Sequence, residues 1–285
     1  TLVAVPLKRG AGAISSLVHA DGLALVPEMS EGLDPGAEVR VELLASEESI
    51  DRTVLAVGSH DIALDTLAAH LLRRPARVRL ASAHVGSMGG LRALAQGEAH
   101  VAGVHLLDPA DGSYNVSYLK RVLGDRPVDL VNLVHREVGL MVRPGNPKGI
   151  AAISDLARPG VVLINRQRGA GTRVLLDHLL ERAGVSPDAV EGYGREVTTH
   201  TMVAAAVAGG AADVGRGIRA AAEALGVELV PLTKERYDLA IPRDLRGEPG
   251  VRELLEVISD PAYRAAVEAL GGYDLRDSGR VMYEG

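Results

Sequence analysis

The chain has 285 residues, and 47% of them are hydrophobic, so it is long enough for more than one domain with sizeable cores. A formal net charge of −6 argues against a nucleic-acid-binding protein, and the lack of Phe and Trp removes the rings on which single strands stack. The sequence has no cysteine, which excludes disulfides, thiolate chemistry and cysteine-based zinc sites, and no apolar run is long enough to span a membrane.

Residues 1–46 predict a small all-β barrel. Short apolar runs at 2–6, 23–26 and 39–44 are separated by glycine-rich turns, without any helical pattern. Residues 47–52 are polar and predict a linker. The chain starts without Met, inside a predicted strand and without a signal-peptide pattern. We therefore expect a fragment of a longer cytoplasmic protein.

From residue 53 onward, strands and helices alternate, which predicts an α/β fold of parallel-type sheets with helices on both faces. The expected strands are 53–57, 78–81, 101–107, one long or two short strands over 128–142, 161–164, 212–215, 227–231 and 237–241. The expected helices are 62–72, 91–96, 114–123, 174–180, 201–208, 218–225, 251–258 and 262–270.

Two features of the 53–285 domain predict a bilobal arrangement. The motif Pro144-Gly-Asn-Pro147 interrupts the alternation near its middle, and the last strand and helices follow a second complete series. We therefore assign 53–139 and 236–285 to the first lobe and 140–235 to the second. In such a fold a ligand lies between the lobes, at the carboxyl ends of the strands.

The segment from Asn165 to Arg173 is the most informative part of the chain. It is a glycine-rich turn between a buried strand and a helix, and it carries Arg166, Arg168 and Arg173. The turn also contains Gly171 and Thr172. A strand that runs through such a turn into a helix aims unpaired N–H groups and a partial positive charge at one point, and guanidinium groups add forked donors. This turn predicts a small-anion site; the alternative is a simple connection whose arginines are solvated.

Small polar residues follow the strands of the first lobe. They are Ser59 and His60 after the first strand, Ser87 and Met88 after the second, and His105 after the third. Both serines stand where an N-cap hydroxyl would stand, and capping alone would explain either one. Facing the arginine-bearing turn, they would together form a cage of neutral donors for an oxyanion.

The second lobe offers further ligand-binding candidates. Thr199 and His200 precede an alanine-rich helix and can present hydroxyl and N–H groups to the cleft. Arg216 either lines the cleft or pairs with Asp213. In the first lobe, Asn115 either closes over a ligand or belongs to an Asx-turn.

The sequence predicts neither a metal site nor a catalytic residue. His60, His84, His105 and His200 all lie at predicted element ends, but their spacing matches no metal-ligand pattern. The run from Gly86 to Gly89 lacks the pattern of a nucleophile elbow.

A set of motifs in the larger domain carries a family resemblance. These motifs are 101–108 with Tyr114-Asn115, 144–149, 165–173 and 212–217. On them, residues 53–280 resemble the periplasmic-binding-protein-like domain found in the cytoplasm of bacteria and archaea. That domain occurs fused to helix-turn-helix regulators or to molybdopterin-biosynthesis proteins. Ala170 stands where the family usually has a serine, which puts one ligand contact in doubt.

The N-terminal region carries a second resemblance. The motifs 10–17, 20–23 and 35–39 make residues 1–46 similar to the C-terminal β-barrel domain of the gephyrin-like molybdopterin molybdotransferases, the MoeA family. The resemblance implies missing N-terminal domains that carry catalysis, so we expect this chain itself to be non-catalytic. It also implies that Ser15 and Ser16 lie on a loop that approaches the active site of the assembled enzyme.

Both resemblances imply a role in molybdenum cofactor biosynthesis, in which the bilobal domain binds molybdate or tungstate. Extracellular binding proteins of this fold hold these anions with hydroxyls and N–H groups at helix starts. The arginines would also suit a carboxylate or phosphate. The alternatives are an accessory part of a molybdotransferase without a ligand, or the effector-sensing domain of a transcriptional regulator. The expected partners are a small anion and the missing domains, and a homodimer is left open. We expect no binding to a membrane or to nucleic acid. No other cofactor is implied.

Overall fold

The computed structural model describes residues 4, 6, 20–27, 29–30, 32–34, 36–108 and 110–285. The chain divides into two compact units, Thr1–Thr53 and Val54–Gly285. The expected strand at 2–6, apart from Ala4 and Pro6, and the expected loop with Ser15 and Ser16 lie outside the described residues.

The first unit contains a two-stranded antiparallel sheet of β1 (Gly22–Ala24) and β2 (Val41–Leu43). The polar segment that follows forms a short helix, α2 (Glu47–Asp51). The Ser46 hydroxyl caps this helix by accepting a hydrogen bond from the N–H of Ser49 at 3.2 Å. A serine cap followed by acidic residues in the first turn favours a helix start.

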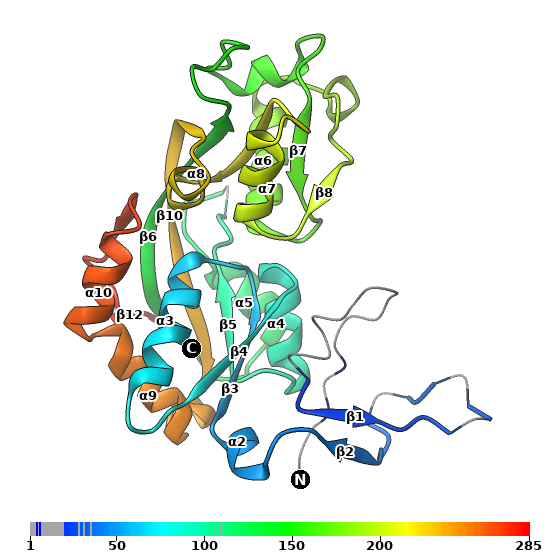
Figure 1. Cartoon of the computed structure of the whole chain (residues 1–285), viewed down its shortest axis with the longest axis vertical. Helices are drawn as coiled ribbons and strands as arrows, with labels where there is room; N and C mark the ends of the chain where they lie inside the picture. Colours follow the sequence, from blue (N-terminus) through cyan, green and yellow to red (C-terminus); the bar gives the residue numbers. More distant parts are fainter. Residues whose placement is uncertain are drawn as a thin grey trace. The chain divides into compact units, whose positions relative to one another are not determined.

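A mixed sheet forms the centre of the second unit, with strand order β4-β3-β5-β10-β6-β9-β7-β8 and with β11 and β12 also beside β6 (Figure 1). Its strands are β3 (Thr53–Gly58), β4 (Arg79–His84), β5 (Val101–Val104), β6 (Val128–Val142), β7 (Leu163–Arg166), β8 (Glu196–Val197), β9 (Val214–Ile218), β10 (Glu228–Pro242), β11 (Tyr273–Asp274) and β12 (Val281–Glu284). Its helices are α3 (Ile62–Arg73), α4 (Ser87–Gln96), α5 (Val116–Leu123), α6 (Gly171–Arg182), α7 (His200–Ala208), α8 (Arg219–Ala224), α9 (Pro249–Ile258) and α10 (Pro261–Glu268), with 3-10 turns at Ile153–Ala157, Pro187–Ala189 and Arg243–Leu245.

The predicted bilobal α/β fold is confirmed. Strands β3 and β5 pair in parallel in one lobe, and β7 pairs in parallel with β8 and β9 in the other. Two long antiparallel strands, β6 and β10, run side by side through both lobes (Figure 1). The expected helices from residue 53 onward are present within a few residues of their predicted bounds.

The expectation of two separate strands at 227–231 and 237–241 is wrong, because β10 continues through both segments. The polar run Thr233 to Arg236 interrupts the apolar pattern, so the sequence does not indicate that one strand continues through it. The register against β6 shifts at both ends of this run, between Pro231 and Thr233 and between Tyr237 and Asp238. Within it, Glu235 pairs directly with Arg136 of β6.

Aliphatic clusters pack on the faces of the sheet in both lobes, as the lack of Phe and Trp requires. In the first lobe, Leu67 and Leu71 of α3 are four residues apart and fully buried, so they lie on one helical face. In the second lobe, Leu176 and Leu180 of α6 repeat this spacing. These cores fix where the strand ends and helix starts between the lobes lie.

Candidate functional site

Neither serine of the first lobe is an N-cap, contrary to expectation. Helix α3 is capped by Asp61, whose carboxylate accepts from the N–H of Ala63 at 2.8 Å, two residues beyond Ser59. Helix α4 has Gly86 at its N-cap, with a φ of 81° that favours glycine, so Ser87 is its first helical residue. The N-cap positions that the sequence analysis gave to Ser59 and Ser87 are therefore occupied by Asp61 and Gly86.

Both serines instead converge on His105, the residue that follows β5. The Ser59 Oγ lies 2.9 Å from His105 Nε2, and the Ser87 Oγ accepts from the backbone N–H of His105 at 3.3 Å. All three residues are buried. The serine hydroxyls thus position the imidazole.

Glycines allow the second lobe to approach these strand ends closely. A Cβ on Gly171, at the start of α6, would lie 2.7 Å from His105 Cε1. A Cβ on Gly86 would lie 2.8 Å from the carbonyl oxygen of Gly169. The glycine-rich turn therefore packs directly on the first lobe.

A buried chain of charged groups links the two long strands to both lobes. Arg136 donates to Asp61 Oδ2 at 2.5 Å and to Glu235 Oε2 at 3.0 Å. Arg216 donates to Glu235 Oε1 at 2.9 Å and to the carbonyl oxygen of Thr172 at 3.1 Å. Burial opposes the charge on Glu235, but Arg216 and His105 hold its pKa well below the usual value.

Arg166 is the exception in this buried group. Its side chain is buried, with the residue 1% exposed, and its Nη2 donates to the carbonyl oxygen of Thr198 at 2.8 Å. Its Nε and Nη1 have no partner, and no carboxylate among the described residues forms an ion pair with it. Burial and then Arg136 lower its pKa to about 10, so it stays charged at neutral pH.

Other buried polar atoms around Arg166 also lack partners. Arg166 donates to the carbonyl oxygen of Thr198, two residues before His200. Burial, followed by the charges of Arg166 and Arg136, lowers the pKa of His200 well below its usual value. At the start of α6, the N–H of Arg173 donates to the Ala170 carbonyl oxygen at 2.9 Å, whereas the N–H groups of Gly171 and Thr172 precede the first hydrogen bond of the helix. The unpartnered atoms are Thr172 Oγ1, both ring nitrogens of His200, the Nε atoms of Arg136 and Arg216, and the Nδ1 atom of His60. His105 Nδ1, in contrast, lies 3.2 Å from Glu235 Oε2.

The formal charges of this interior do not cancel. Arg136, Arg166 and Arg216 contribute three positive charges, and Asp61 and Glu235 contribute two negative charges. His105 and His200 are neutral near pH 7, since burial lowers the pKa of His105 to about 4 and that of His200 also falls. One buried positive charge with free donors therefore remains, which suits an anion.

Two arginines of the predicted site point elsewhere. Arg173 donates to Asp177 at 2.9 Å and to Glu196 at 3.0 Å, and its guanidinium lies 4.1 Å from the ring centroid of Tyr193. The side chain of Arg168 is 90% exposed and lies 3.8 Å from Glu196. Carboxylates of the second lobe capture these charges, so Arg166 alone of the three turns inward without a counter-ion.

The remaining candidates of the second lobe have structural contacts. Thr199 caps α7 by accepting from the N–H of Met202 at 3.1 Å, and His200 directly follows it. Arg216 does not pair with Asp213, since Arg143 occupies that carboxylate at 3.1 Å.

In the first lobe, Met88 packs against an apolar cluster. Asn115 is buried, accepts from the N–H of Leu106 at 2.6 Å and donates to Asp238 at 2.9 Å. These bonds fix the loop that precedes α5, so Asn115 holds a turn and does not close over the site.

Arg136 and Glu235 belong to this interior but were missed in the sequence. A charged residue inside a strand could have indicated both residues. Arg136 interrupts the apolar run of β6, and Glu235 lies in the polar run of β10. A charge in a strand that is buried on both faces requires a partner.

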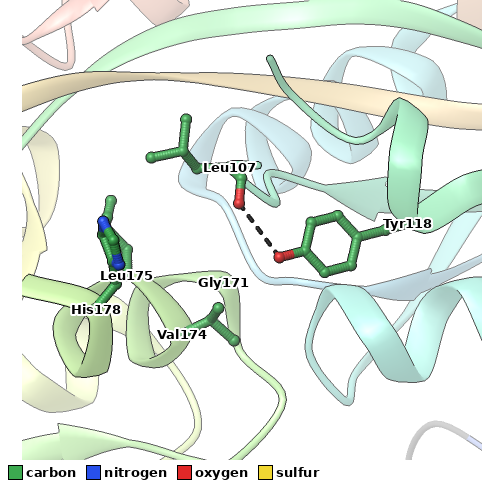
Figure 2. A pocket seen from close by; sticks show the side chains of 6 residues that line it. All are labelled: Leu107, Tyr118, Gly171, Val174, Leu175 and His178. Atoms are coloured by element: carbon green, nitrogen blue, oxygen red, sulfur yellow. Dashed lines mark hydrogen bonds between the residues drawn. The ribbon is translucent and has the colours of Figure 1, made fainter. Parts of the chain in front are cut away.

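An apolar hollow lies beside the polar cluster, between α6 and the segment after β5 (Figure 2). The Tyr118 hydroxyl donates to the carbonyl oxygen of Leu107 at 3.3 Å on one side, and Val174 and His178 line the other. Gly171 borders both the hollow and His105. The hollow contains none of the unpartnered arginine groups, so we place the anion candidate in the buried cluster.

Among the residues that the structure describes, no helix is long and apolar enough to cross a membrane. Nor does that part of the chain hold a group of three or more His, Cys, Asp or Glu side chains arranged to bind a metal ion.

Comparison with known families matches residues 68–259 to the PBP superfamily domain. The chain belongs to this family. A relative, the uncharacterised protein YvgK of Bacillus subtilis, is 36% identical over 233 residues, which cover 82% of this chain and 75% of that protein. An uncharacterised protein in the 5′ region of a ferredoxin 2Fe-2S gene of Clostridium pasteurianum is 34% identical over 112 residues, 39% of this chain and 99% of that protein.

Solved structures share the PBP fold at low sequence identity. A protein described as the tungstate ABC transporter of Geobacter sulfurreducens has a TM-score of 0.55 at 15% identity, covering 76% of this chain and 98% of that one. The sulfate-binding protein of Mycobacterium tuberculosis has a TM-score of 0.56 at 14% identity, covering 77% and 85%. A phosphate-bound structure from Clostridium perfringens has a TM-score of 0.58 at 13% identity, covering 79% and 100%.

The N-terminal unit has its own match. Residues 1–44 match the MoeA C-terminal region, also called domain IV. The match covers the same segment as the sequence resemblance to the molybdotransferases.

Proposed function

We propose that this PBP-family chain binds a small oxyanion in the buried cluster between its lobes. The observation that carries the proposal is Arg166, a buried guanidinium with two unpartnered nitrogens and no counter-ion among the described residues. Leaving such a charge unpaired in an apolar interior is costly, whereas an oxyanion would both neutralise it and accept its forked donors.

The surrounding groups complete the proposed site. The further donors are the Thr172 hydroxyl, the N–H groups of Gly171 and Thr172 at the start of α6, the Arg216 Nε and His200. Ser59 and Ser87 act through His105 instead of touching the ligand.

Molybdate and tungstate are the ligands that we propose first, in the setting of cytoplasmic molybdenum cofactor biosynthesis. The support is the match of residues 1–44 to the MoeA C-terminal region, and the fold shared with a protein described as a tungstate transporter adds to it. The fold is equally shared with sulfate- and phosphate-binding structures, so these anions are the comparison ligands.

Titration calorimetry of the whole chain with molybdate, tungstate, sulfate and phosphate tests this function. Arg166→Met should weaken binding of the preferred anion at least about tenfold, near 1.4 kcal/mol, because it removes the unpaired charge. Arg168→Met is the matched control, since this arginine lies in the same turn but is exposed. Its affinity should stay within about twofold of the original chain.

Two outcomes would contradict the proposal. If no anion produces heat, an accessory role without a ligand would be favoured. Equal losses for the two methionine variants would show that general charge, not the buried guanidinium, drives binding.

A further inference from the structure

We infer that a doubly charged oxyanion enters this site together with one proton, and that His200 holds the proton. This inference rests on the proposed function and adds the protonation state of the bound complex.

The first argument is the hydrogen-bonding capacity of His200. This imidazole is 0% exposed, and neither ring nitrogen has a partner. A neutral imidazole offers one donor and one acceptor, whereas a protonated one offers two donors. An oxyanion without protons offers acceptors only, so the His200 nitrogen that faces it has to carry a proton, and a protonated ring makes that hydrogen bond charge-assisted.

The second argument is charge balance. The cluster of Arg136, Arg166, Arg216, Asp61 and Glu235 has one excess positive charge. The other buried carboxylate nearby, Asp238, is balanced by Arg236 at 2.9 Å. A dianion would therefore leave the interior with one negative charge, and a single added proton brings it to zero, which avoids an uncompensated buried charge.

The third argument explains why the proton arrives with the ligand. Arg166 of β7 donates to the carbonyl oxygen of Thr198, two residues before His200, and the Cβ position of Gly217, next to Arg216 of β9, lies 3.4 Å from His200 Nδ1. Burial, followed by the charges of Arg166 and Arg136 and by His105 and His60, keeps the pKa of His200 well below its usual value. Glu235 on β10 is engaged by Arg136, Arg216 and His105 Nδ1. A bound dianion reverses the local field, so the imidazole gains its proton at that step.

The linkage has a definite sign. If the complex holds one more proton than the free protein and free ligand, affinity rises as pH falls. Between the pKa of His200 in the free protein and that in the complex, the dissociation constant decreases by up to about tenfold for each unit of decreasing pH.

The test is calorimetry of the whole chain with molybdate and with sulfate, near neutral pH, in two buffers that differ in ionisation enthalpy. Both ligands are fully deprotonated dianions there, so any proton taken up belongs to the protein. We expect uptake of close to one proton per anion bound. His200→Gln keeps one donor and one acceptor but cannot be protonated, so it should bind more weakly, without proton uptake and with little pH dependence.

His70→Gln is the control, because His70 lies on α3 against Tyr263 and has no contact with the cluster. It should retain the proton uptake of the original chain. Nitrogen NMR of the labelled histidine rings gives a second readout that needs no variant: one ring should change from neutral to doubly protonated when molybdate is added.

Anion binding without proton uptake, or uptake that persists in a folded His200→Gln variant, would overturn this inference and leave the proposed function intact. Absence of binding for every anion would overturn the proposed function, and this inference with it.

Discussion

Gly171 of the second lobe and His105 of the first lobe lie in direct contact. A Cβ at Gly171 would lie 2.7 Å from Cε1 and 2.8 Å from the carbonyl oxygen of His105. The carbonyl oxygen belongs to the backbone, so it cannot move away as the end of a flexible side chain can. The start of α6 therefore reaches the first lobe only because position 171 has no side chain.

Gly171→Ala should accordingly hold the lobes apart. We expect at least about tenfold weaker anion binding, because the α6 N–H groups and Arg166 no longer reach the first lobe together. Small-angle scattering should give a larger radius of gyration than for the original chain. Gly194→Ala is the control, since a Cβ there meets nothing within 4 Å. Unchanged affinity in Gly171→Ala would contradict the closed arrangement as the binding state.

Arg173→Ala should affect stability more than binding. Arg173 contacts Asp177, Glu196 and the Tyr193 ring, all within the second lobe. Losing these partly exposed pairs and the cation–π contact should lower the free energy of unfolding by about 1 kcal/mol. Urea denaturation measures this loss, and calorimetry should find the anion affinity within about twofold of the original. A large loss of affinity at unchanged stability would instead restore Arg173 as a ligand residue.

The ligand-free chain should lose stability in mild acid through His105. Burial and Arg136 lower the pKa of His105 from 6.5 to about 4. The depressed value means that His105 contributes its full stability above about pH 6.5, and that this contribution is lost as pH falls towards about 4. The loss amounts to at most about 3 kcal/mol, from roughly 1.4 kcal/mol per pKa unit.

Urea unfolding at a series of pH values, compared with His105→Gln, isolates this effect from that of the carboxylates. The variant should show a smaller decline between neutral pH and about pH 4, because glutamine does not titrate. Identical pH profiles for the two chains would mean that His105 is not held neutral by the fold.

The fold was predictable because apolar runs and helical faces repeat along the chain, whereas the site was predictable only in part. The glycine-rich turn indicated an anion and named Arg166, but the sequence could not decide which of its three arginines lacks a counter-ion. Asp177 lies four residues after Arg173, a spacing that favours pairing on a helix. Glu196, the other carboxylate, reaches the turn only through the pairing of β8 with β7.

Long-range packing explains the other differences. The sequence placed Ser59 and Ser87 at helix starts, but which hydroxyl caps a helix depends on where the first turn forms, and both serines turn to His105 instead. Arg136 and Glu235 lie about a hundred residues apart and meet only because β6 and β10 pair. Local patterns contain no information about such a contact.

Any hinge motion of this molecule has to deform the continuous ribbon of β6 and β10, since both strands extend through the two lobes. The register irregularities on either side of Thr233 to Tyr237 are where the ladder of main-chain hydrogen bonds is already broken, so twisting costs least there. The Arg136–Glu235 pair lies between those two weak points. A rotation of one lobe against the other would therefore change the geometry of this ion pair. Conversely, a change of charge in the buried cluster would favour a different angle between the lobes.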